Sequence, residues 1–154
     1  MSHKDYIRAT SVIREKIEDC DLVGPRNHDL IVAAEAILGF TFPRDLRHFI
    51  AEFGAGDIGG SEVYGVVANR PDSVGPPDGV KLTVLARTEW SLPANFFVLY
   101  FDGFEYYYII DCKSSEDPPI LAWFPGEAVN PKKEFITHGS FGEFLEELAS
   151  WIEE

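Results

Sequence analysis

Positively charged residues are scarce in this chain, in which 13 Lys and Arg stand against 26 Asp and Glu for a formal net charge of −13. A surface this acidic repels phosphate, so nucleic acids and anionic membranes are disfavoured as partners. The imbalance is greatest in residues 78–154, which carry 5 basic and 14 acidic side chains. Two interpretations stay open: a solvated surface that keeps the protein soluble, or a docking surface for a basic partner.

Long apolar runs are absent as well. No stretch of 18 or more apolar residues is present, and the first residues, Met-Ser-His-Lys-Asp, contain no apolar segment of a secretory signal. The two cysteines, Cys20 and Cys112, form no Cys-x-x-Cys pair, which argues against a disulfide scaffold and a zinc ribbon. We therefore expect a cytoplasmic protein whose residues 1–154 form a single domain.

Motifs of catalytic and metal-binding sites are also missing. The four histidines show no metal-ligand spacing such as His-Glu-x-x-His, and no serine lies in a Gly-x-Ser-x-Gly elbow. Carboxylate pairs such as Glu116-Asp117 lie in expected turns, where water screens them and a raised pKa is not expected. We expect no enzyme, cofactor or metal, although residues distant in sequence can still converge in space.

The most informative stretch runs from Leu38 to Val66. Gly39 is placed to end one helix and Pro43 to begin the next, whose apolar residues recur at helical spacing until Gly54. The glycines that follow fit the spacing Gly-x-Gly-x-x-Gly. They come after a helix and before a strand, however, which is the reverse of a dinucleotide-binding loop. We interpret them as a connection to a strand at residues 62–68.

Helical periodicity predicts three further segments. Residues 2–20 carry an apolar stripe at helical spacing, and residues 27–38 form a second helix with Asn27 as its N-cap. A closing helix is expected at residues 140–152, where Ser140 and Glu143 match a capping box. These helices supply the apolar faces that a sheet needs for burial.

The second half of the chain favours strands. Asp102-Gly103 predicts a two-residue hairpin turn that pairs Phe101 with Phe104, and a further short strand is expected at residues 120–124. Both faces of this hairpin are largely apolar, so we expect helices to cover one face and the other to be partly open. Residues 69–79 predict a surface loop, and residues 80–90 fit either a strand or a helix.

Several short sequence motifs, in their order along the chain, resemble those of the SUKH superfamily. They are Leu38-Gly39, Phe42-Pro43, Phe53-Gly54, Glu62-Val63-Tyr64-Gly65, and the two later segments 92–98 and 103–111. The similarity covers about residues 27–150. It implies an α+β fold with one antiparallel sheet of about four to six strands, packed with N-terminal helices and a C-terminal helix, and it favours a helix at residues 80–90.

The resemblance also implies a function. Many bacterial SUKH members are immunity proteins that bind and neutralise a cognate toxin, often a nuclease. The superfamily also includes the yeast cell-wall-assembly regulators, so a general protein-interaction module is the alternative. An acidic inhibitor suits a nuclease, because the enzyme presents a basic groove built for phosphate. No nucleic acid or membrane partner is expected, and the sequence does not indicate an oligomeric state.

A protein-binding surface is predicted on the acidic sheet half of the molecule. From Glu89 to Glu127 the chain has seven acidic residues against the single basic Lys113, with tyrosines among them. Aromatic side chains ringed by charge are plausible anchors. The predicted residues are Asp57, Glu62, Tyr100, Asp102, Glu105, Tyr107, Asp111, Glu116 and Asp117.

Overall fold

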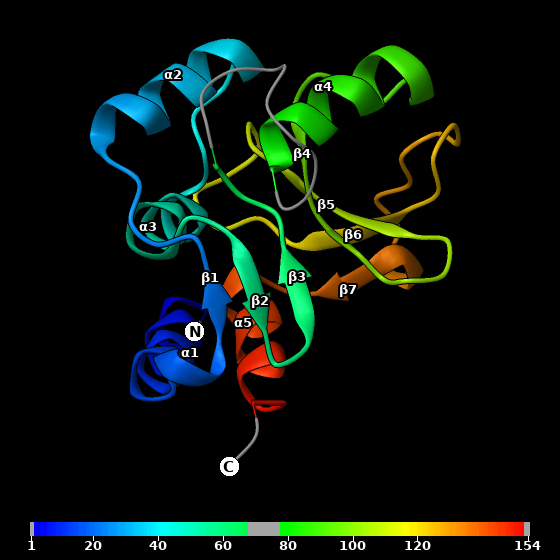
Figure 1. Cartoon of the computed structure of the whole chain (residues 1–154). Coiled ribbons are helices and arrows are strands. Elements are labelled where there is room, and N and C mark those ends of the chain that lie inside the picture. The colour runs from blue at the N-terminus through cyan, green and yellow to red at the C-terminus, as the bar shows by residue number, and fades with distance from the viewer. Residues whose placement is uncertain (1, 68–77, 153–154) are drawn as a thin grey trace.

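The computed structural model describes residues 2–67 and 78–152, and these residues fold as an α+β domain (Figure 1). None of the described helices is long and apolar enough to cross a bilayer. The described residues form the helices α1 (Ser2–Glu15), α2 (His28–Leu38), α3 (Arg44–Phe53), α4 (Gly79–Trp90) and α5 (Phe141–Ala149), with two 3-10 turns, η1 (Ile17–Asp19) and η2 (Lys133–Phe135).

The strands are all antiparallel, as predicted, but they are divided between two sheets. The smaller sheet has the order β1 (Asp21–Leu22), β2 (Gly56–Ile58) and β3 (Ser61–Val63). The larger has the order β4 (Phe96–Phe101), β5 (Tyr107–Asp111), β6 (Ile120–Trp123) and β7 (Ile136–His138). Just after β3, the N–H of Tyr64 donates to the carbonyl of Leu99 at 2.8 Å, which ties the two sheets together.

The helices α2 and α3 form where the local signals place them. Asn27 caps α2 by accepting a hydrogen bond from the N–H of Leu30 at 2.9 Å, and Gly39 ends the helix in the left-handed conformation with φ of 83°. Pro43 stands at the N-cap of α3, and Gly54 ends it. The predicted order of breaks and helices is therefore confirmed.

The glycine-rich segment after α3 differs from the prediction. It is not a simple connection, because its middle residues form β2, and Gly59 and Gly60 turn the chain into β3. The following strand is also shorter than the expected 62–68, since it ends at Val63, and residue 68 lies outside the described residues. The predicted surface loop at 69–79 falls largely outside them too, although Asp78 caps α4 and Gly79 begins it.

The β4–β5 hairpin exists, but its predicted two-residue turn is wrong. Phe101 pairs with Tyr107 instead of Phe104, and Leu99 forms a bulge that shifts the register by one residue. The carboxylate of Asp102 accepts hydrogen bonds from three successive N–H groups, at residues 104, 105 and 106, over 2.8 to 3.2 Å. These bonds hold a wider loop, which the N–H of Asp102 closes by donating to the carbonyl of Tyr106.

The periodicity of residues 80–90 fitted either a strand or a helix. They form helix α4, as the family resemblance favours. It covers the face of the large sheet that we expected to be partly open, so that expectation is wrong. The sheet and α4 share a buried apolar cluster on this face, which consists of Tyr64, Ala86, Leu92, Phe96, Val98, Ile109, Leu121 and Trp123. The sheet is therefore buried on both sides, between α4 and the layer of α1, α3 and α5 (Figure 1).

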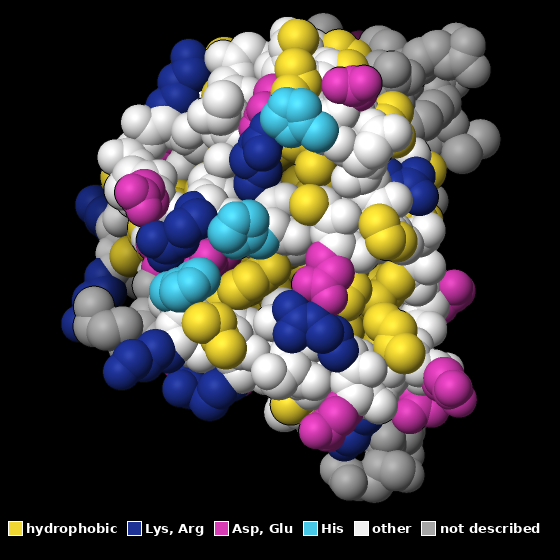
Figure 2. Space-filling view, turned by 90° about the vertical axis from the view of Figure 1, so that its left-hand side faces the viewer, with side chains coloured by type: hydrophobic (Ala, Val, Ile, Leu, Met, Phe, Trp, Pro, Cys, Tyr) yellow, Lys and Arg dark blue, Asp and Glu magenta, His cyan; other side chains and the backbone are white. Residues whose placement is uncertain are grey.

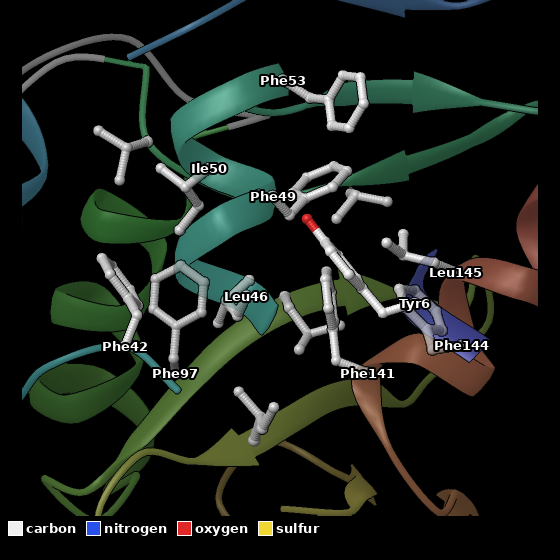
Figure 3. Packing of buried hydrophobic residues seen from close by; sticks show 14 of the residues in the cluster. Tyr6, Phe42, Leu46, Phe49, Ile50, Phe53, Phe97, Phe141, Phe144 and Leu145 are labelled. Atoms are coloured by element: carbon white, nitrogen blue, oxygen red, sulfur yellow. The ribbon is translucent and has the colours of Figure 1, made fainter. Parts of the chain in front are cut away.

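The main core lies on the other face of the large sheet. Figure 3 shows Tyr6 of α1, Phe49 of α3, and Phe141 and Phe144 of α5 pointing toward one another, and all four are buried. The rings of Phe49 and Phe141 meet edge to face, with centroids 5.5 Å apart. Helix α5 begins at the predicted cap, where Ser140 accepts from the N–H of Glu143 at 3.1 Å. The first and last helices, α1 and α5, pack against each other.

The β1–β2 pairing gives a stability prediction, because Gly56 brings the two backbones unusually close. A Cβ at Gly56 would lie 2.2 Å from the carbonyl oxygen of Asp21, whereas a Cβ at Gly60 would meet nothing within 4 Å. Both glycines have positive φ, so Gly60→Ala should lose about 1–2 kcal/mol from backbone strain alone. Gly56→Ala should lose about 2 kcal/mol more, measured by urea unfolding. Equal losses would show that β1 does not pair there.

Candidate protein-binding surface

Two of the predicted residues, Asp57 and Glu62, lie directly opposite each other in the small sheet. The register places Asp21 of β1 opposite Asp57 on the other side, so three carboxylates form a row across the sheet. Side chains of directly paired residues share one face. The alternate residues Ile58 and Val63 are buried in the core, and the carboxylate row therefore lies on the outer face.

More carboxylates gather at the neighbouring end of α1. Residues 15–22 include four acidic side chains and one basic one, and Glu15, Glu18 and Asp19 are exposed. The C-terminal end of a helix carries partial negative charge, so acidic residues there are unfavourable for the helix. We name these three residues together with Asp21, Asp57 and Glu62 the acidic border.

An apolar hollow of about 410 Å³ lies beside this border, between α1, β1 and α3. It is lined by Arg14, Ile17, Cys20, Leu22, Gly24, Pro25, Glu52 and Phe53. On one wall the guanidinium of Arg14 donates to both carboxylate oxygens of Glu52, at 2.5 and 2.8 Å. Figure 2, which views this side of the molecule, shows hydrophobic side chains at the surface with both acidic and basic side chains around them and histidines nearby.

The hollow and the border interact electrostatically at Cys20. Partial burial raises the pKa of the Cys20 thiol, and the nearby carboxylates of Asp19 and Asp57 raise it further. The carboxylates of Asp57 on the sheet and Asp19 on the 3-10 turn therefore both disfavour the thiolate form of Cys20. The acidic border and the hollow adjoin along the chain, because Cys20 and Leu22 of the lining alternate with Asp19 and Asp21 of the border.

The predicted residues of the large sheet lie elsewhere. Asp102 and Glu105 are at the tip of the β4–β5 hairpin, where Phe104 is 89 % exposed. Asp111 pairs with Phe96 at the opposite end of this hairpin, five residue steps or about 17 Å from the tip. Its carboxylate accepts from the N–H of Lys113 at 2.9 Å. These positions do not form one patch.

The two predicted tyrosine anchors are half-buried and packed within the molecule. The hydroxyl of Tyr100 lies 3.3 Å from the Ser61 hydroxyl, and its ring contacts Tyr108 at a centroid distance of 4.9 Å. Tyr107 packs on the other face of the sheet, against Trp90 and Phe101. Both rings thus already contribute to internal packing.

Glu116 and Asp117 lie beside the start of α3. Arg44 donates to Glu116 Oε1 at 3.0 Å and to Asp45 Oδ1 at 3.2 Å, and His3 Nδ1 lies 2.8 Å from the same Asp45 oxygen. Burial and the nearby carboxylate of Asp45 raise the pKa of Asp117. Our expectation of an unshifted pKa in this pair is therefore wrong for Asp117, because its Oδ2 is buried without a hydrogen-bond partner among the described residues.

The side chains that could act as metal ligands or nucleophiles include the histidines and the two cysteines. No group of three or more His, Cys, Asp or Glu side chains there could hold a metal ion. His138 is engaged with Glu147, with Nε2 and Oε1 2.6 Å apart. Both free thiols have raised pKa values through burial, at Cys20 and more strongly at Cys112, which disfavours the reactive thiolate.

Sequence reasoning missed the first half of this candidate surface. We counted charge along the chain and assigned the acidic surface to Asp57, Glu62 and the segment 89–127, whereas Asp21 meets Asp57 only through an unpredicted two-residue strand. One local signal was available: four acidic residues fall within Glu15 to Asp21. Acidic residues near a helix C-terminus are unfavourable for the helix, and such departures from local preference are expected at functional sites.

Comparison with known proteins identifies the family. The family model SUKH_5, described as SMI1-KNR4 cell-wall, matches residues 10–152. This match confirms the resemblance seen in the sequence and extends it toward the N-terminus, into the last part of α1. A search among curated proteins gave no match.

The carboxylate row gives a second stability prediction. Like charges directly opposite each other in a sheet are destabilising, and Asp57 stands between two of them. Asp57→Asn removes this repulsion yet keeps an oxygen for the N–H of Gly60, to which Asp57 Oδ1 is bonded at 3.0 Å. The variant should therefore be more stable by about 0.2–1 kcal/mol in urea unfolding at low salt. The exposed control Glu105→Gln should change little, and an unstable Asp57→Asn variant would contradict the repulsion.

Asp117 gives a pH-dependent prediction. Its raised folded-state pKa stabilises the fold only below the unfolded value near 3.8, and this contribution is lost as pH rises through the folded pKa. At pH 7, Asp117→Asn should therefore raise the melting temperature, because the ionised carboxylate is disfavoured by burial. The gain should shrink as the pH falls toward 4. A gain independent of pH, or one matched by Glu116→Gln, would contradict this account.

Proposed function

This chain belongs to the SMI1-KNR4 family of the SUKH superfamily, and on that premise we propose that it is an immunity protein. It would bind a cognate toxin domain, with a basic nuclease as the expected class, and neutralise it in the cytoplasm by direct contact. The observation that carries the proposal is the acidic border beside an apolar hollow, in a protein of net charge −13.

The charge of the protein suits a nuclease partner for a physical reason. A nuclease groove attracts phosphate with Lys and Arg, and carboxylates held on a folded surface can occupy the same groove. Charge complementarity of this kind raises the association rate and suppresses wrong partners. The same charge keeps the protein away from the nucleic acid that the toxin attacks.

The proposal assigns no catalytic role to the chain. Inhibition by occupation needs a rigid surface, and both sheets and all five described helices contribute to the buried core beneath it. The raised pKa values of both thiols and the engagement of His3 with Asp45 and of His138 with Glu147 agree with this assignment. No cofactor is required for a binding function.

A second candidate function follows from the description of the family, which names the cell wall. In that case the chain would be a general interaction module with several partners. The two functions differ in genomic setting, because an immunity gene lies beside the gene of its toxin. A solitary gene whose product copurifies with several unrelated proteins favours the interaction module.

Co-expression tests the immunity function directly. Each toxin domain encoded beside this gene is expressed in a sensitive host, with and without the protein, and cell survival is measured. We expect rescue from one toxin domain and a stable complex of the two purified proteins. The association rate should fall as salt rises toward 0.15 M, where the Debye length is about 8 Å, because screening removes long-range attraction.

The control for this experiment is a toxin domain inactivated in its catalytic residues. It should form the same complex without killing the host, which separates binding from survival. Failure to rescue cells from every neighbouring toxin domain, together with an absence of complexes, would contradict the immunity function. Rescue with no salt dependence of the association rate would contradict the electrostatic part of the argument.

A further inference from the structure

The hollow between α1, β1 and α3 has the properties of a protein docking pocket. Its lining is mostly apolar, and the side chain of Ile17 on its rim is 43 % exposed. Val23, two residues from Pro25, is 38 % exposed. An apolar hollow of this size gains affinity when a partner side chain displaces its water.

The charge is negative along the edge of the hollow formed by residues 18–21, while Arg26 lies at the Pro25 end, where its guanidinium donates to the carbonyl groups of Val23 and Pro25. The one arginine of the lining, Arg14, is neutralised by its two hydrogen bonds to Glu52. Glu18, Asp19 and Asp21 are exposed at the other edge, and Asp57 lies close enough to raise the pKa of Cys20 inside the hollow. A positively charged group that approaches this edge therefore meets several carboxylates.

Two features of this surface are unfavourable for the isolated fold. Three carboxylates stand in register across the small sheet, and Glu15 in the last turn of α1 opposes the helix dipole. Basic or neutral residues at these positions would make the protein more stable. Departures from local preference are expected at functional sites, so the acidic border is explained by a partner that neutralises it.

We propose that the hollow with its acidic border is the docking site for the toxin, and that it takes a Leu, Met or Trp side chain flanked by Arg or Lys. The inference rests on the proposed immunity function and adds the surface and the chemistry of the partner. The apolar side chain fills the hollow. The flanking cations pair with Asp19, Asp21 and Asp57, and Arg suits these pairs because its planar group binds a carboxylate through two hydrogen bonds.

Two other surfaces fit a basic partner less well. A groove of about 440 Å³ between α1 and α5 has Ile7 on its rim, but its charges, Arg8 and Glu146, are paired at 2.7 Å. The hairpin tip presents Phe104, with Glu105 beside it, as a projecting side chain that is 89 % exposed. Of these three surfaces, the hollow at β1 is the one that combines an apolar lining with the carboxylate row of the small sheet beside it.

Cys20 provides a native reporter of this site. It is half-buried in the lining of the hollow, and the other cysteine, Cys112, is buried in the core as an internal control. Iodoacetamide is applied at pH 8.5 to the free protein and to its complex with the inactivated toxin domain, and labelling is followed by mass spectrometry. We expect the complex to slow labelling of Cys20 at least about tenfold, with Cys112 unlabelled in both.

Charge reversal identifies the contribution of the border. Asp21→Lys and Asp57→Lys are compared with Glu89→Lys, an exposed position on α4 that undergoes the same change of charge. Glu146 and Glu147 are unsuitable controls, because they pair with Arg8 and His138. We expect Kd to rise about 30-fold or more for the border variants and less than about threefold for the control. Asp57→Asn, which keeps the turn bond to Gly60, should weaken binding in the same direction if charge reversal impairs folding.

The outcomes separate this inference from the proposed function. Slower labelling of Cys20 with selective losses at the border supports the site. A stable complex in which Cys20 is labelled as fast as in the free protein overturns the site and leaves the immunity function standing. Equal losses at the border and at Glu89 also overturn it, because net charge alone would then explain binding. If no neighbouring toxin domain binds at all, both proposals fail.

Discussion

Burial of the β4–β5 hairpin on both faces is the constraint on which this fold depends. Phe97 and Ile110 face the layer of α1, α3 and α5, while Val98 and Ile109 face α4, and all four side chains are fully buried. Helices must therefore cover both sides of the sheet. The small sheet is held at the edge of this core by Ile58 and Val63, which leaves its outer face free for other residues.

The exposed outer face of the small sheet explains how the fold tolerates many acidic residues. Carboxylates on the outer face of β1–β3 and at the end of α1 reduce stability only by mutual repulsion and by an unfavourable helix dipole, each worth about 1 kcal/mol or less. The large apolar core can tolerate such losses. The proposed toxin contact would then turn the same repulsion into binding free energy, because a cationic partner relieves it.

Local sequence signals predicted the helices better than the sheets. Gly39 and Gly54 end helices through backbone conformation, and Asn27 and Ser140 begin them through side-chain caps, so these boundaries are encoded nearby. The hairpin register was missed because the Leu99 bulge and the Asp102 loop depend on bonds that the alternation of residues does not show.

The candidate surface was only half visible for the same reason. Asp57 and Glu62 were singled out from composition, but strand β1 is two residues long and exists because Gly56 lets the backbone of Asp21 approach. Contacts of this kind are non-local. A strand of two residues is too short to show a periodic pattern from which it could be predicted. Likewise, the raised pKa of Asp117 arises from burial beside Asp45, which lies 72 positions earlier in the chain.

The most direct test of the central claim is to map the toxin contact on the protein by backbone amide chemical shifts. The ¹⁵N-labelled protein is titrated with the inactivated toxin domain, and the perturbed amides are located on the structure. The acid-bordered hollow predicts the largest changes at residues 17–22 and at Asp57. Changes centred on the hairpin tip around Glu105 or on α4, with residues 17–22 unaffected, would contradict it.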